Sequence, residues 1–399
     1  MPQLSFGGIE APLSFTPEAG PVREALSSIL IGWPSAPSVA RDIDPLVEVD
    51  LDAQGVHLSS KTDDWRRLEP TPESAVCTLV VELMAAYVDG DPALGNLHAG
   101  AVEIGGRLVV FPATNRAGKS TLVTALGAAG HRVFADDLLP IDLRSLEAVA
   151  SGCLPRLRLP LPPGAPDDLK NAVVERSVLS DGYYAFVAPP ENRIVRHGDR
   201  APIGAIVLLD RSDAPVKVRV EPARPDEALL RVLIQDTKSR YAARWTFERY
   251  FDLIETVRIE RLTYSDIGDA IACLEEAFSH WPEPISPVRA SSVPDAVWQP
   301  RDEFAETPRN GARFRRSPDV LMRAIGDSAF LVDTRRNEIH HLNPSGLGIW
   351  NLLAEPTDEL TIIELFVEAF PETSVTTIQR DIGALLGSFE SEGLVERVA

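Results

Sequence analysis

The sequence predicts an α/β body followed by a small α+β domain. Three observations lead to this prediction. A Gly-Lys-Ser-Thr segment at 118–121 lies between a strand pattern and a helix pattern. A proline-rich stretch interrupts the periodicity at 281–316, and three strand patterns followed by three helix patterns occupy the remainder of the chain. The chain has 399 residues, 44 % of them hydrophobic, which is enough for two or three domains with a sizeable core.

The proline-rich stretch divides the chain. Six prolines lie within 281–316, and no sustained periodicity runs through them, so we expect an extended linker there. The body before the linker comprises an N-terminal α/β part at 1–95 and a domain at 96–280 that contains the Gly-Lys-Ser-Thr segment. A separate domain is expected at 317–399.

Composition excludes several classes of protein. The chain carries 59 Asp and Glu against 39 Lys and Arg, a formal net charge of −20. A sequence-independent nucleic-acid binder or a protein adsorbed to anionic lipid needs a basic surface, so neither nucleic acid nor membrane is expected as a partner. The three cysteines are far apart, and no secretory signal or membrane-spanning run is visible. These features favour the reducing cytoplasm, and they leave the oligomeric state, including a homo-oligomer, open.

The Gly-Lys-Ser-Thr segment matches the end of the phosphate-binding loop pattern GxxxxGK[ST], although Ala113 replaces its first glycine. Backbone N–H groups at a helix N-terminus bind phosphate oxygens, Lys119 would neutralise phosphate charge, and the hydroxyl of Ser120 would bind Mg²⁺. Lysine is rare in this chain, occurring five times, which makes its position informative. We therefore predict that ATP and Mg²⁺ bind here, and we expect the nucleotide to contact Asn115, Arg116, Ala117, Gly118, Lys119, Ser120 and Thr121.

Two adjacent carboxylates follow the next strand pattern. Asp136 and Asp137 come about 16 residues after Lys119, so both are expected at a neighbouring strand end. One of them can hold Mg²⁺, for which we choose Asp136 together with Ser120, and the other can accept a proton from an attacking hydroxyl. A solvated turn would also explain an Asp pair. His98, upstream of the loop, would by itself more often be a structural histidine.

These residues resemble the HPr kinase/phosphorylase family and its kinase-like relatives. The resemblance rests on LHAGAVEI, NRAGKSTL and HRVFADD, and it covers residues 96–142 well. It implies an HPr kinase-like P-loop fold and transfer of the γ-phosphoryl group of ATP to a protein serine. By position, it implies a catalytic set of His98, Lys119, Asp136 and Asp137. The family's C-terminal substrate-binding signature is absent, so HPr itself is not the expected substrate. Arg156 and Arg158 follow the matched segment. They could bind phosphate, but we interpret them as solvated surface arginines.

The tail has the order of elements of a small winged-helix-like domain. Alternating apolar residues predict three antiparallel strands between 319 and 342. Asn343-Pro344 opens a first helix, and Thr361 with Glu364 forms a capping box for a second. The third helix carries one apolar stripe, formed by Val375, Ile378, Ile382, Leu385 and Phe389. A DNA reader can have this architecture, but residues 311–399 hold 8 Arg and no Lys against 14 acidic residues, a net charge of −6, which argues against it.

The tail also resembles PqqD and the PqqD-like recognition elements of ribosomally made peptide pathways. The strand pairs, IHHLNPSGLGIW and FESEGLVE carry this resemblance across 317–399. It implies that the leader of a precursor peptide binds as an added strand beside the third strand, against the last helix. The residues expected to contact the leader are Glu338, Ile339, His340, His341, Leu342 and Ile378.

Together, these features predict an ATP-dependent serine kinase with a C-terminal peptide-recognition domain. The tail would hold the leader of the precursor, and the body would phosphorylate a Ser, or less readily a Thr or Tyr, in its core. One alternative is a non-catalytic adaptor that binds nucleotide and leader, which Ala113 favours. Another is a nucleotide-responsive regulator. Transient phosphorylation that activates a hydroxyl for elimination is equally compatible with these residues.

Overall fold

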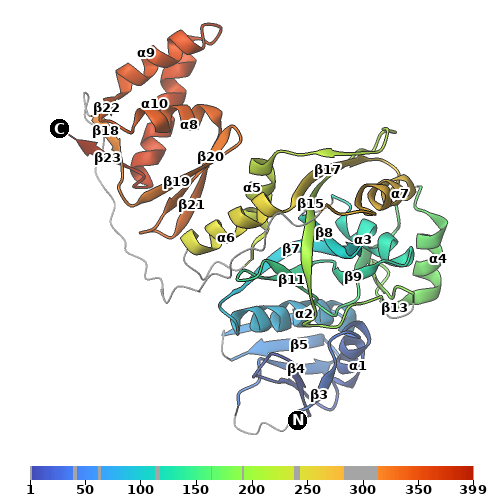
Figure 1. Cartoon of the computed structure of the whole chain (residues 1–399). Helices are drawn as coiled ribbons and strands as arrows, with labels where there is room; N and C mark the ends of the chain where they lie inside the picture. Colours follow the sequence, from blue (N-terminus) through green and yellow to red (C-terminus); the bar gives the residue numbers. More distant parts are fainter. Residues whose placement is uncertain are drawn as a thin grey trace. The chain divides into compact units, whose positions relative to one another are not determined.

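The computed structural model describes residues 2–38, 43–61, 64–112, 117–162, 164–190, 193–237, 243–282 and 313–398. The chain divides into two compact units (Figure 1). Among the described residues, the first unit contains 2–237 and 249–282, and the second contains 243–248 and 313–398. Most of the expected linker at 281–316 lies outside the described residues.

The first unit begins with a six-stranded sheet and two helices. The strands, in spatial order, are β3 (Ser35–Pro37), β1 (Gln3–Phe6), β2 (Leu13–Phe15), β4 (Val47–Asp52), β5 (Gly55–Ser60) and β6 (Trp65–Glu69). The helices are α1 (Gly20–Ile29) and α2 (Pro72–Asp89). Thr71 caps α2, because its hydroxyl accepts the N–H of Ser74 at 3.2 Å. Apolar residues occur on most sides of α2, since it packs on β5 of this sheet and on β7 of the next (Figure 1).

The second sheet of this unit is mixed and carries the helices that form the site. Its strands, in spatial order, are β11 (Glu147–Val149), β10 (Leu138–Asp142), β7 (Leu94–Ile104), β8 (Arg107–Pro112), β15 (Arg200–Arg211), β17 (Arg258–Tyr264) and β16 (Arg219–Pro222), with β9 (Arg132–Ala135) also paired to β7. The strands β7 and β8 form a hairpin. Gly105 and Gly106 form its turn with φ of 60° and 87°, a backbone that glycine adopts without steric cost. The strand β8 runs parallel to β15, and β15 runs parallel to β17.

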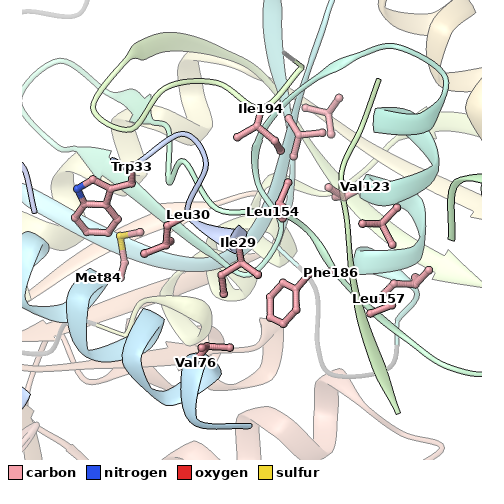
Figure 2. Close-up of a cluster of buried hydrophobic side chains, with 14 of the residues drawn as sticks. Ile29, Leu30, Trp33, Val76, Met84, Val123, Leu154, Leu157, Phe186 and Ile194 are labelled. Carbon is pink, nitrogen blue, oxygen red and sulfur yellow. The ribbon is translucent and has the colours of Figure 1, made fainter. Parts of the chain in front are cut away.

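A third, small sheet and five helices complete the first unit. The first residues of one of these helices, 243–248 of α6, belong to the second unit. The sheet has the order β12 (Arg156–Arg158), β14 (Tyr184–Val187) and β13 (Ser177–Ser180). The helices are α3 (Lys119–Ala128), α4 (Asp167–Arg176), α5 (Pro225–Gln235), α6 (Ala243–Thr256) and α7 (Ile267–Phe278). One hydrophobic core runs through the unit, and Figure 2 shows the part of it where α2 meets the segments that carry Leu154 and Phe186.

The second unit consists of two small sheets and three helices, together with the first residues of α6. The first sheet has the order β22 (Thr357–Asp358), β18 (Arg313–Arg316) and β23 (Val395–Val398). The second has the order β19 (Val320–Ile325), β20 (Ser328–Asp333) and β21 (Glu338–Leu342). The helices are α8 (Pro344–Leu352), α9 (Glu359–Ala369) and α10 (Val375–Ser391). The three expected antiparallel strands are thus present, whereas the sheet of β18, β22 and β23 was not foreseen.

Two details of the expected helices in this unit are wrong. Asp358, rather than Thr361, caps α9, because its carboxylate accepts the N–H of Thr361 at 2.9 Å. On α10, Val375 is 48 % exposed, and Leu386 is buried with Ile378, Ile382 and Phe389. The buried stripe therefore starts one turn later than expected, since Val375 lies in the first turn of the helix.

No described helix is both long and apolar enough to cross a membrane.

Candidate active site

Two glycines determine the position of the N-terminus of α3. Gly118 precedes the helix with φ of 88°, a left-handed backbone that other residues rarely adopt. Gly100 of β7 allows α3 to approach the sheet, because a Cβ there would lie 2.6 Å from Val123 and 3.2 Å from the side chain of Lys119. The side chain of Lys119 is consequently held against the sheet, and the residue is only 6 % exposed.

His98 and Asp137 are brought together by strand pairing. His98 on β7 lies opposite Leu138 on β10, and the N–H of Ala99 donates to the carbonyl of Asp137 at 3.1 Å. The two side chains meet with Nε2 of His98 2.9 Å from Oδ1 of Asp137. Nζ of Lys119 lies 3.4 Å from the same oxygen. Two of the expected residues, His98 and Lys119, therefore converge on one carboxylate oxygen of a third, Asp137.

The environment of Asp137 keeps it ionised. Burial acts to raise the pKa of its carboxyl group, but the hydrogen bond from His98 and the charges of Lys119, His98 and Arg156 outweigh it and lower that pKa. About 45 % of the side chain is exposed, so a substrate can reach it. A carboxylate in this state can accept a hydrogen bond from a hydroxyl group of a substrate.

Asp136 has the opposite environment. Its side chain points into the protein, the residue is 6 % exposed, and the N–H of Arg156 donates to its Oδ2 at 2.9 Å. Burial raises the pKa of its carboxyl group, and the charge of Asp137 adds to the effect, whereas Lys119, the Arg156 amide and the Ser120 hydroxyl oppose it. Its Oδ1 has no hydrogen-bond partner of normal geometry among the described residues. Adjacent carboxyl groups with pKa values shifted in opposite directions are typical of acid–base sites.

His98, Lys119 and Asp137, but not Asp136, line a cleft of about 540 Å³, called the α3 cleft below. Its lining contains His98, Ala117, Gly118, Lys119, Ser120, Thr121, Asp137, Arg156, Arg158, Pro160, Pro162, Tyr184 and Arg211. The interpretation of Arg156 as a solvated surface arginine is wrong, because it is half-buried and one of its guanidinium nitrogens lies 3.8 Å from a carboxylate oxygen of Asp137. Arg158, two residues further along β12, is exposed as expected and also lines the cleft.

Sequence reasoning missed Gln235 and Arg211. Oε1 of Gln235, at the end of α5, lies 2.8 Å from Nδ1 of His98, so the imidazole is held between Gln235 and Asp137. Arg211 ends β15 and reaches the cleft beside Gly118. No local pattern marks either residue, because each is more than 90 positions away from its partner in the cleft.

The residues fit a nucleotide with one Mg²⁺ ion. Helix N-terminal amides, Lys119 and three arginines suit phosphate groups. Among the described residues there is no cluster of three or more His, Cys, Asp or Glu that could hold a metal alone. Mg²⁺ is usually held by one or two protein oxygens together with substrate phosphates, for which the free Oδ1 of Asp136 and the hydroxyl of Ser120 are suitable. Asn115 and Arg116, also expected to contact nucleotide, lie outside the described residues, as does Ala113.

The second unit presents a sheet edge. The strand β21 pairs with β20 and ends the order β19-β20-β21 among the described strands. Leu342 is buried in the helix-covered core, and Nδ1 of His340 lies 3.1 Å from a carboxylate oxygen of Glu392. On the other face, the ring of His341 lies 4.9 Å from that of Phe330, which in turn contacts Phe247. Glu338 and His341 are exposed, and Ile339 is half-buried.

Ile378 does not belong to an open groove. It is 6 % exposed and lies in the core of this unit with Ile382, Leu386 and Phe389. The expectation that it contacts a leader peptide therefore needs correction, since packing has already covered its side chain.

Fold and site together define a mixed α/β protein with a charged cleft at a helix N-terminus and a small C-terminal domain. The family model described as coenzyme PQQ synthesis protein D (PqqD) matches residues 328–395. No curated protein matches the chain.

Two solved structures show weak similarity. One is TbiB1 in complex with the TbiA(beta) leader peptide, at 24 % identity, covering 21 % of this chain and 98 % of that one, with a TM-score of 0.20. The other is the Hpr(Ser) kinase/phosphatase from Coxiella burnetii, at 12 % identity, covering 46 % of this chain and 89 % of that one, with a TM-score of 0.24.

Proposed function

We propose that the chain is an ATP-dependent peptide kinase of a pathway that modifies ribosomally made peptides. Its C-terminal domain binds the leader of the precursor peptide, and its body phosphorylates a Ser, or less readily a Thr or Tyr, in the core. The observation that carries the proposal is the convergence of His98 and Lys119 on Asp137 at the mouth of the α3 cleft, in a chain that also has a PqqD-matching domain.

In this proposal the α3 cleft binds ATP in the manner of a P-loop. The amides at the start of α3 contact phosphate oxygens, and Lys119, Arg156 and Arg211 neutralise their charge. Ser120 and Asp136 hold Mg²⁺, which supplies further charge neutralisation when it is bound. Binding of a cation at Oδ1 of Asp136 would also favour its ionised form, which burial otherwise disfavours.

Asp137 receives the acceptor hydroxyl. The hydroxyl oxygen attacks the γ-phosphorus, the bond between that phosphorus and the β–γ bridging oxygen breaks, and ADP leaves. The hydroxyl proton passes to the Asp137 carboxylate. His98 orients that carboxylate through the 2.9 Å contact and is itself fixed by Gln235. A carboxylate with a lowered pKa is a weak base, so its main contribution is to position the hydroxyl, as expected for a loose transition state.

The leader binds along β21 by strand addition in this proposal. Main-chain N–H and C=O groups of Glu338–Leu342 pair with the extended leader, and neighbouring side chains discriminate between sequences. Tethering by the leader raises the local concentration of the acceptor to about the millimolar range, so the body needs only a weak contact with the core.

The proposal is tested with the full chain, ATP, Mg²⁺ and a candidate precursor encoded beside its gene. Mass spectrometry should show the gain of one phosphoryl group on the core and none on a precursor in which the acceptor Ser is replaced by Ala. Leader binding and ATP binding without any phosphoryl transfer would instead support the non-catalytic adaptor, which the Ala113 substitution in the loop pattern favours.

A further inference from the structure

A second cavity lies on the other side of the aspartate pair. It has a volume of about 220 Å³, and we call it the α2 pocket. Asp137 and Arg156 line both this pocket and the α3 cleft, so one wall separates the two. The remaining lining consists of Arg67, Cys77, Thr78, Val80, Val81, Met84, Asp136, Leu138, Ser151, Cys153, Leu154 and Phe186.

The far wall of the α2 pocket is apolar and rigid. Met84 on α2, Leu154, and Phe186 on β14 are 1 %, 2 % and 5 % exposed, and Figure 2 shows them within the hydrophobic core. The rim is open to solvent, because Val81 is 48 % exposed and Arg67 is also exposed. The pocket is thus an accessible apolar recess beside Asp137.

Position and chemistry together indicate what occupies this pocket. A hydroxyl that reacts at Asp137 must face the α3 cleft, so the peptide that carries it lies along the shared wall. Neighbouring side chains of an extended peptide are about 3.3–3.8 Å apart along the chain, which brings one of them to the α2 pocket. An aliphatic or aromatic side chain would gain from burial against Met84, Leu154 and Phe186, whereas a carboxylate would lose hydration beside Asp136 and Asp137.

We infer that the α2 pocket is a specificity subsite for the acceptor peptide, which takes a Leu-, Ile- or Phe-sized apolar side chain within two residues of the phosphorylated hydroxyl. This inference rests on the proposed kinase function and adds a substrate preference to it.

The test uses the full chain with ATP, Mg²⁺ and synthetic Ser peptides at millimolar concentration. Leu, Phe, Gly, Asp or Lys is placed in turn at each of the two positions before and after the Ser. At one of these positions, Leu or Phe should exceed Gly and Asp by about tenfold or more in kcat/KM, as expected for burial of one such side chain.

Two variants of Val81 probe the pocket itself. Val81→Phe fills the rim and should lower kcat/KM for the preferred peptide about tenfold, while the Kd for ATP stays within about twofold. Val81→Ala is a mild change that widens the pocket and should shift the preference from Leu toward Phe. The matched control is Val174→Phe on α4, where the valine is 83 % exposed and lies outside the described linings of both cavities, and it should have no effect.

The outcomes separate the two proposals. Phosphorylation that shows no preference at any scanned position, together with wild-type activity in both Val81 variants, overturns the subsite and leaves the kinase proposal standing. A parallel loss of ATP affinity in Val81→Phe also overturns the subsite and assigns the pocket to the nucleotide. If no peptide and no precursor is phosphorylated, both proposals fall.

Discussion

The α3 cleft and the β21 edge differ in which part of the chain would carry the recognition proposed for each. At the cleft, side chains from β7, α3 and β12 converge, Gln235 of α5 holds His98, and the charged residue Lys119 is only 6 % exposed. At the edge, the main-chain groups of β21 would make the contacts, and side chains such as Glu338 and His341 are exposed. A site made of side chains should be sensitive to single substitutions. A site made of main chain should tolerate most of them and be disrupted by proline.

Replacement of Lys119 should have the largest effect. Lys119→Ala removes a nearly buried positive charge from the proposed phosphate site, so ATP binding should weaken strongly and phosphoryl transfer should fall by at least about 10³-fold. Calorimetric titration with ATP and Mg²⁺ measures the binding. Lys170→Ala, at an exposed lysine that pairs with Asp167 on the surface of α4, is the matched control. Unchanged ATP affinity in Lys119→Ala would refute the assignment of the cleft to nucleotide.

The two aspartates should separate binding from chemistry. Asp137→Asn should keep the ATP affinity within a few fold and lose about 10²–10⁴ in the rate of transfer, because the neutral amide positions the hydroxyl less well and cannot accept its proton. Asp136→Asn should instead weaken the dependence of ATP binding on Mg²⁺. Single-turnover rates and titrations with and without Mg²⁺ distinguish the variants, with the exposed Asp213→Asn as control. A fully active Asp137→Asn enzyme would contradict the role given to this carboxylate.

Proline substitutions along β21 test the main-chain site. Neighbouring residues of a strand direct their N–H groups to opposite sides, so Ile339→Pro and His340→Pro should behave differently. The variant that loses an N–H group directed at β20 should have a lower melting temperature. The variant that loses an outward-directed N–H group should keep the melting temperature and bind a labelled leader about 3–30-fold more weakly. This is the loss expected for an edge hydrogen bond plus a steric conflict. Equal leader affinity in both variants would place the leader elsewhere on the domain.

The last prediction concerns the stability of the scaffold behind the cleft rather than either site. His197 stacks on Trp33 with ring centroids 3.6 Å apart, and its Nδ1 lies 3.2 Å from the carbonyl of Ser151. Burial lowers its pKa from 6.5 to about 4, although hydrogen bonds to backbone oppose this. Between these two pH values the unfolded chain binds more protons than the folded one, so the stability of the body should fall as the pH falls through this range, by about 2–3 kcal/mol.

This prediction is checked by urea unfolding at several pH values. His197→Phe keeps an aromatic ring on Trp33 but cannot be protonated, so its unfolding free energy should depend less on pH between about 6.5 and about 4. His280→Phe, at an exposed histidine, should keep the wild-type dependence. An unchanged pH dependence in His197→Phe would show that other groups dominate the acid response.

Local pattern was sufficient to locate part of the candidate site. Lys119, Ser120, Asp136 and Asp137 lie in one strand–loop–helix–strand run. The structure gathers Lys119, Ser120 and Asp137 with His98 around the α3 cleft, whereas Asp136 lines the adjacent α2 pocket. The roles given to these residues remain predictions. In the tail, the alternation of apolar residues correctly predicted β19, β20 and β21, because strand period and turn residues are local properties. The helix cap at Asp358 was missed, since both Asp358 and Thr361 are acceptable capping residues and only the backbone decides between them.

What the sequence determined by itself was therefore the order of three strands and three helices in the tail, the acidic character that argues against nucleic acid, and the residues of one continuous motif. Tertiary structure alone decided that Gln235 holds His98, that Arg156 faces Asp137, and that α2 adds an apolar pocket beside them. The physical reason is distance along the chain. Gln235 is 137 positions from His98, Arg156 is 19 positions from Asp137, and the α2 residues of the pocket are more than 50 positions from Asp137. These contacts arise from strand pairing and core packing, which no local period encodes.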